Sequence, residues 1–308
     1  MIHMPGRSYT GALPPLDDQG KALADELRAR VELLAGRIGD RSVQRPRALH
    51  AAADAIDDAF RAAGLATARQ TFDVGGVACD NVEAAIAGRA GSSDVVVVGA
   101  HYDSVPFTTG ANDNGSGTAA LLALARLFAG SHPRAALRFV AFANEEMPHF
   151  QTGTMGSMQY ARRCKERGEK VVAMISLETI GYYSDADGSQ EYPWPLAALY
   201  PSTGNFIGFV GDLSSRSLVR RAVGTFRRTT EFPSEGAALF RALPGVGWSD
   251  HWSFWQEGYP AIMVTDTAPF RYPHYHQVTD TPDKLDYGRM ARVVAGLQHV
   301  VADLAGVP

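Results

Sequence analysis

Apolar residues in the first part of the chain recur every three or four positions, which is typical of amphipathic helices. The first run of this kind consists of Leu23, Leu27, Val31, Leu34 and Ile38. Asp17 and Asp18 precede that run and can cap the first helical turn. Gly64, a typical helix terminator, follows a second run, Leu49, Ala53, Ile56 and Phe60. The pattern therefore predicts a helical N-terminal segment over about 17–64.

Beyond residue 65 the pattern changes to short apolar runs separated by polar turns and amphipathic stretches. Strands are predicted at 71–74, 81–87, 95–98, 137–143, 171–177, 206–210 and 261–264. Helices are predicted at 121–128, 155–165, 214–228 and 286–304. This alternation predicts an α/β fold in which helices cover both faces of a mixed, mostly parallel central sheet.

We find no internal repeat and no low-complexity linker, so residues 1–308 are predicted to form one domain with a catalytic core over about 65–308. The segment after Gly181 is rich in Tyr, Trp and Pro and is expected to form a rim or an insertion. We expect a cytoplasmic protein without a membrane segment, because no apolar run approaches the ~20 residues of a spanning helix. A secreted protein would need a signal segment ahead of the given sequence.

Charge and cysteine content limit the possible partners and metal ligands of the protein. The net charge of -4 offers no basic field for nucleic acid. Cys79 and Cys164 lack the paired spacing of a zinc finger and cannot form a disulfide framework. Any metal must therefore be held by histidines and carboxylates.

Polar residues follow several predicted strands, at the sheet edge where ligands bind in open α/β folds. His101 and Asp103 follow the strand at 95–98 and lie two positions apart, so in an extended chain they share a side. Asp103 could hold the imidazole from its far nitrogen, as carboxylates do behind metal-bound histidines. A polar strand end without function is the alternative.

Glu145 and Glu146 end the next apolar strand. Neighbouring strand residues point to opposite faces, so one Glu could bind a metal while the other acts as a general base. A solvated acidic turn is the alternative, since Glu is mostly exposed in proteins.

Three further positions carry candidate ligands. Asp113 lies among small residues before a helix, where it could cap that helix or approach two cations closely. Glu178 closes another apolar strand and could equally be an ordinary polar strand end. His276 could bind a metal, or it could belong, with His274, to a loop in which both imidazoles form ordinary hydrogen bonds. Together these residues bring several acids to one edge of the sheet. Burying their negative charges side by side would cost considerable free energy unless cations were bound. Mixed His and carboxylate ligands suit Zn²⁺, and also Mn²⁺ or Co²⁺.

The order and spacing of these motifs resemble the M28 peptidases, the zinc aminopeptidase family that also includes the glutaminyl cyclases. The resemblance runs from about Asn81 to Tyr287. It rests on His101-x-Asp103, the Gly110–Gly117 loop, Asn144-Glu145-Glu146, Ser249-Asp250-His251 and Tyr275-His276-x-x-x-Asp280. It implies the zinc-dependent exopeptidase fold, also described as phosphorylase/hydrolase-like.

The resemblance also implies roles for individual residues. Asp113 would bridge two zinc ions, and the other ligands would be His101 with Glu178 and Glu146 with His276. Glu145 would be the general base, and Asp103 would orient His101. The Asp113–Asn114 peptide matches a position that is cis in relatives.

Three features depart from the family pattern. The position of Glu178 is more often Asp. The segment after Glu146 is longer than usual and reaches Gly156 only through Pro148 and its neighbours. No Tyr directly precedes Ser249-Asp250-His251, so the oxyanion role is assigned to Tyr275.

The expected activity is hydrolysis of peptide bonds by a dizinc-activated water, as an aminopeptidase acting on a peptide or peptide-like small substrate. A glutaminyl cyclase, typically with one zinc, or another non-peptide amidohydrolase is the first alternative. A non-catalytic binding domain is the second. A preference for large apolar N-terminal residues is expected if nearby aromatic residues line a pocket rather than the core: Trp248, Trp252, Phe254, Trp255, Tyr272 and Phe150.

Overall fold

The computed structural model describes residues 3–307, which form helices and strands in alternation. The helices are α1 (Asp18–Val31), α2 (Pro46–Ala62), α3 (Gly117–Phe128), α4 (Gly156–Glu166), α5 (Arg216–Thr229), α6 (His251–Gln256) and α7 (Tyr287–Ala305). The strands are β1 (Ala66–Val74), β2 (Val77–Ile86), β3 (Asp94–His101), β4 (Ala136–Phe142), β5 (Lys170–Glu178), β6 (Ile207–Asp212), β7 (Ser234–Leu239) and β8 (Ala261–Thr265).

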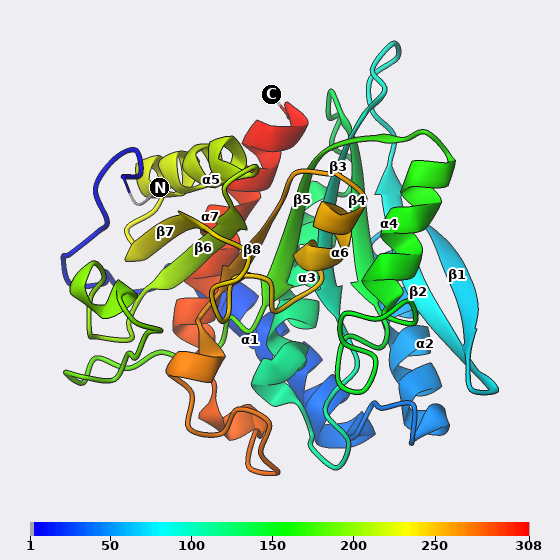
Figure 1. Cartoon of the computed structure of the whole chain (residues 1–308), viewed down its shortest axis with the longest axis horizontal. Helices are drawn as coiled ribbons and strands as arrows, with labels where there is room; N and C mark the ends of the chain where they lie inside the picture. Colours follow the sequence, from blue (N-terminus) through cyan, green and yellow to red (C-terminus); the bar gives the residue numbers. More distant parts are fainter. Residues whose placement is uncertain (1–2, 308) are drawn as a thin grey trace.

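All eight of these strands belong to one sheet with the order β1-β2-β4-β3-β5-β8-β6-β7 (Figure 1). The neighbours β3/β4, β3/β5, β5/β8 and β6/β7 are parallel, and the remaining pairs are antiparallel. The predicted α/β class with a mixed, mostly parallel sheet is therefore confirmed. From β3 the chain goes to β4 on one side and then to β5 on the other, so the direction of winding reverses between β3 and β5.

The two faces of the sheet carry separate cores because successive strand residues point to opposite sides. In β3, Val96 and Val98 pack into a core with α1, α2, α3, α5 and α7, whereas Val95 and Val97 pack against α4 and α6. Figure 1 shows α3 and α7 behind the sheet and α4 and α6 in front of it. The continuous Val run at 95–98 is thus a strand buried on both faces.

The predicted helix ends agree with the observed caps. The Asp17 side chain accepts a hydrogen bond of 2.7 Å from the backbone N–H of Gly20 at the start of α1. Gly64 follows α2 with a φ of 79°, a left-handed conformation that favours glycine. Within residues 3–307, no helix is both long enough and apolar enough to cross a membrane.

Two elements and one detail differ from the sequence prediction. Strand β7 and the short helix α6 were not predicted, because β7 is rich in Ala and Gly and α6 is too short to show a period. Strand β4 ends at Phe142, and Asn144 has a φ of 59°, so Glu145 and Glu146 lie in a turn. The prediction that strand alternation separates these two acids is wrong.

Replacing Phe226 by Ala should lower the free energy of unfolding by about 3–5 kcal/mol, because a large cavity would remain. Phe226 is fully buried on α5 and packs edge-on against Phe209, with 5.3 Å between ring centroids. The matched control is Phe107→Ala, since the Phe107 side chain is 68% exposed and its loss should cost less than about 0.5 kcal/mol. Denaturant titration measures both, and equal effects would contradict the assigned core.

Candidate metal centre

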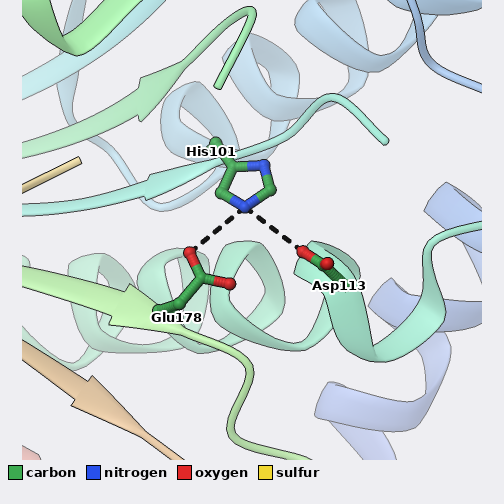
Figure 2. A group of neighbouring side chains, drawn as sticks. All are labelled: His101, Asp113 and Glu178. Atoms are coloured by element: carbon green, nitrogen blue, oxygen red, sulfur yellow. Dashed lines mark ion pairs between the residues drawn. The ribbon is translucent and has the colours of Figure 1, made fainter. Parts of the chain in front are cut away.

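The sheet edge at the reversal between β3 and β5 carries the first group of candidate ligands. His101 ends β3, Glu178 ends β5, and Asp113 lies in the irregular turn Ala111–Ser116 before α3. The Nε2 atom of His101 lies 3.4 Å from Asp113 Oδ1 and 3.2 Å from Glu178 Oε2 (Figure 2). The carboxyl ends of strands at such a reversal are where open α/β sheets bind ligands.

A second group shares Asp113. The Nε2 atom of His276 lies 3.1 Å from Asp113 Oδ2 and 3.5 Å from Glu146 Oε2. Asp113 therefore turns one oxygen toward each imidazole, with the geometry of a bridging carboxylate. His276 is the outermost member, with a 38% exposed side chain, whereas the other four side chains are at most 10% exposed.

These distances fit zinc. Two ligand atoms at about 2.0–2.2 Å from a tetrahedral ion lie about 3.3–3.6 Å apart, close to the observed spacings. Both ring nitrogens of His101 and the Oε1 atom of Glu146 are buried and have no hydrogen-bond partner within residues 3–307. Buried polar atoms normally have a partner, and a cation would provide one. The five residues expected to bind metal are thus brought together in two groups that share Asp113.

The charges at this centre strongly influence one another. Burial alone would lower the pKa of His101, but the carboxylates of Glu178 and Glu145 outweigh it and raise that pKa well above its ordinary value. Burial raises the pKa of Glu145 and of Glu146 well above the ordinary range, and neighbouring carboxylates add to the shift. Burial also opposes ionisation of Asp113, but its two imidazole neighbours lower its pKa overall.

Asp103 holds the acidic turn in place. Its two oxygens accept hydrogen bonds from the backbone N–H groups of Glu145 and Glu146, at 3.0 and 3.1 Å. Its Oδ1 atom lies 3.5 Å from Nδ1 of His101, on the side of the ring away from Asp113. The carboxylate of Glu145 lies 3.9 Å from His101 Nε2, at the edge of the ligand cluster. Asp103 is therefore placed to orient both the histidine and the turn.

Asp280 holds the backbone at Asp113 in the same way as Asp103 holds the acidic turn. Its oxygens accept from the backbone N–H groups of Asn112 and Asp113, at 2.9 and 3.1 Å, and the Tyr272 hydroxyl donates to it at 2.8 Å. The peptide between Asp113 and Asn114 is cis, as expected from the resemblance. The sequence analysis gave Asp280 no role, although an Asp four positions after a candidate ligand was a usable signal.

The Ser249-Asp250-His251 motif lies directly behind Glu178. The Ser249 hydroxyl donates to Glu178 Oε2 at 2.7 Å and also contacts the hydroxyl of Ser176 at 2.8 Å. Asp250 is fully buried, and its carboxylate oxygens have no hydrogen-bond partner among the described residues. Burial raises the pKa of Asp250 to about 7. The motif thus fixes one ligand and adds a further acid close to the centre.

An apolar trough leads away from Glu178 across the sheet. Its floor follows one row of strand partners, in which Glu178 pairs with Thr265, Thr265 with Gly208, and Gly208 with Glu235. Three strand spacings of about 4.8 Å give this row a length of about 14 Å. Gly208 leaves the floor without a side chain, and Tyr275 lines the trough near the metal ligands. Tyr275 also stacks on His276, with ring centroids 3.8 Å apart.

The walls of the trough include the predicted rim. Tyr192, Pro193 and Leu196 from the segment after Gly181 line it, together with Trp248 and Phe270. The cavity between these walls has a volume of about 100 Å³.

Of the six aromatic residues singled out from the sequence, only Trp248 lines the trough. Phe254 and Trp255 are buried in the core beneath α4 and α6, and Trp252 packs against that core. Tyr272 is buried against Asp280. Other aromatic residues line the trough instead, among them Tyr200, Phe206 and Phe270, which the sequence analysis did not assign to a pocket.

Comparison with known proteins agrees with this geometry. The sequence model of the family described as "Peptidase family M28" matches residues 81–301, which is most of the chain. The chain belongs to peptidase family M28. The "Uncharacterized protein YfbL" of Escherichia coli is 36% identical, over 90% of this chain and 87% of that protein.

Two further relatives of this M28 chain carry names that specify an activity. The "Aminopeptidase YwaD" of Bacillus subtilis is 38% identical over 33% of this chain and 23% of that protein. A "Probable leucine aminopeptidase" of Arthroderma otae is 29% identical over 72% of this chain and 57% of that protein. The chain thus spans only part of both. Family membership and relatives named zinc metalloprotease support a zinc-dependent peptidase.

Solved structures share the fold of this M28 chain. A zinc aminopeptidase from Bacillus subtilis, BSAP, superimposes with a TM-score of 0.71 at 17% identity, over 91% of this chain and 95% of that chain. A glutaminyl cyclase from Fimbriiglobus ruber gives a TM-score of 0.68 at 21% identity, over 95% and 97%. At such identities the likeness establishes the fold alone.

Zinc affinity should rise with pH between 6 and 8. The neighbouring carboxylates raise the pKa of His101 well above its ordinary value, so the imidazole of the metal-free centre holds a proton that zinc binding must release. Each released proton should strengthen apparent binding about tenfold per pH unit. Calorimetric titration in two buffers of different ionisation enthalpy counts those protons. An affinity that does not change with pH would contradict the assigned ligand set.

Proposed function

We propose that this protein is an aminopeptidase that uses two zinc ions. His101 and Glu178 would hold one ion, Glu146 and His276 would hold the other, and Asp113 would bridge them. The proposal depends on one observation about Asp113. Its two carboxylate oxygens lie 3.4 and 3.1 Å from the Nε2 atoms of two different imidazoles, those of His101 and His276. The aminopeptidase names of relatives support the choice of substrate.

Bound zinc would act as a Lewis acid on the scissile carbonyl and would lower the pKa of an attacking water molecule. Glu145, whose own pKa is raised by burial, is suited to accept the proton of that water and to return it to the leaving amine. Asp103 supports this by fixing the backbone of Glu145. The Tyr275 hydroxyl is assigned the stabilisation of the tetrahedral oxyanion, because Tyr275 borders both the ligands and the trough.

The trough is assigned to the side chain of the N-terminal residue. It starts at Glu178 and extends sideways along the sheet under an aromatic rim, so it would accept a large apolar side chain. Burying such a side chain contributes about 1.5–3 kcal/mol, enough to select it over a small one. A carboxylate of the centre that is not engaged by metal would bind the free α-amine.

Replacing Glu145 by Gln should leave the zinc content unchanged and lower kcat roughly 10²–10⁴-fold, because the amide cannot accept the proton. Elemental analysis measures the zinc, and an aminoacyl-nitroanilide assay with and without chelator measures turnover. Glu166→Gln is the matched control, since Glu166 is exposed at the end of α4. Turnover like that of the unaltered protein in the Glu145 variant would remove Glu145 from the mechanism.

Replacing Trp248 by Ala should raise the KM for leucine or phenylalanine nitroanilide about tenfold or more, through lost apolar contact in the trough. The Trp248 side chain is 43% exposed and stacks on Phe270, so stability should change little. Trp194→Ala is the control, because Trp194 is 89% exposed and is not part of the trough lining. Identical KM values for the two variants, or a preference for Lys or Glu substrates, would refute the assignment.

Glutaminyl cyclisation is the second candidate, favoured by the fold likeness to the Fimbriiglobus ruber enzyme. A zinc-to-protein ratio near one, together with cyclisation of peptides with N-terminal Gln, would establish it in place of peptide hydrolysis. A ratio near two with release of N-terminal residues supports the aminopeptidase. Protein that binds no zinc, even when zinc is added, would leave only a non-catalytic binding role.

A further inference from the structure

Arg41 is a fully buried cation behind the metal centre. It lies in the connection between the helical turns Glu32–Ile38 and helix α2. Its guanidinium donates hydrogen bonds to five backbone carbonyl oxygens at 2.6–3.1 Å, those of Leu34, Gly39, Tyr102, Thr109 and Gly110. Its own backbone N–H donates to the Ser104 hydroxyl at 3.1 Å.

None of these partners is a carboxylate, which is unusual for a buried arginine. Burial lowers the pKa of Arg41 to about 10, and nearby Asp103, Asp280 and Asp113 partly offset that effect. The side chain therefore stays charged at neutral pH, and its charge acts on the two carboxylates that fix the ligand-bearing turns and on the bridging residue. Only a guanidinium offers five donors in one rigid plane.

The positions of the acceptors explain what these bonds hold. Tyr102 lies between His101 and Asp103, and Thr109 with Gly110 leads into the turn that carries Asp113. Arg41 therefore joins the two ends of the loop that separates two candidate ligands. The other two acceptors belong to the N-terminal helical segment.

Gly110 shows how closely this site is packed. Its φ of 56° is left-handed, and a Cβ atom there would lie 2.4 Å from the Asp113 carbonyl oxygen and 2.9 Å from the Arg41 guanidinium. The backbone of the Asp113 turn thus approaches Arg41 without space for a side chain. A displacement of Arg41 would be passed to that turn directly.

We propose that Arg41 is a positioning residue that couples the N-terminal segment 34–41 to the bridging Asp113, so that zinc affinity depends on it. This inference rests on the proposed metal centre. Arg41 touches neither metal ligand atoms nor the trough, and it acts through the backbone of the loop 102–110.

The first test compares zinc binding by Arg41→Met and Arg41→Lys with that of the unaltered protein, using competition with a chromophoric chelator. Loss of residues that support ligands typically weakens metal binding about 10–100-fold, and we expect this for Arg41→Met. Arg41→Lys keeps the charge but has three donors, so it should restore the affinity only in part. Arg126→Met is the matched control. Arg126 lies on α3 and joins that helix to α1 through an ion pair with Glu26, away from the loop 102–110.

Thermal unfolding of the metal-free variants separates positioning from stability. An Arg41→Met protein that is less stable yet binds zinc as tightly as the unaltered protein would overturn the inference, and so would full rescue by Arg41→Lys. If the unaltered protein itself binds no zinc, the proposed metal centre fails instead. The two failures are thereby distinguished.

A second test needs no variant and covers the case in which Arg41→Met does not fold. Coupling is reciprocal, so zinc binding should protect both 102–113 and 34–41 from amide hydrogen exchange. Helix α5, which packs on β6, β7 and α7, serves as the internal control and should change little. Protection confined to 102–113 would overturn the inference.

Discussion

The site depends on the mutual repulsion of carboxylates that the fold buries at one sheet edge. Asp113, Glu145, Glu146 and Glu178 meet there with only His101 and the partly exposed His276 among them. Burial raises the pKa values of these glutamates, and the neighbouring carboxylates raise them further, because like charges at such distances cannot all ionise. In the proposed dizinc centre, the two cations would remove this conflict, and Asp113 would bind both of them.

The same edge shows how a protein can hold ligands that loops alone would leave mobile. Asp103 and Asp280 each accept two consecutive backbone N–H groups, one pair at the acidic turn and one at the bridging residue. Arg41 does the reverse and donates hydrogen bonds to backbone carbonyl groups of the loop 102–110. Charged hydrogen bonds to the backbone are stronger than neutral ones, so a few side chains can fix the turns that carry the ligands.

The trough extends from this centre across the sheet. One row of strand partners runs along its floor from Glu178 to Glu235, and its walls come from segments far apart along the chain. Glu178 belongs to both the candidate ligand set and the trough lining, so in the proposed aminopeptidase it would link the position of the metal to that of the bound side chain.

The sequence by itself determined the strand and helix periods, the mixed sheet and the ligand types, because apolar spacing and ligand chemistry are local properties. It could also associate His101 and Glu178 with one sheet edge, since strand ends meet there. Only the tertiary structure decided that Glu145 and Glu146 lie in a turn, and that Asp280 and Arg41 support the bridging residue. Those contacts join residues far apart along the chain, and no local pattern records which distant segments will pack together.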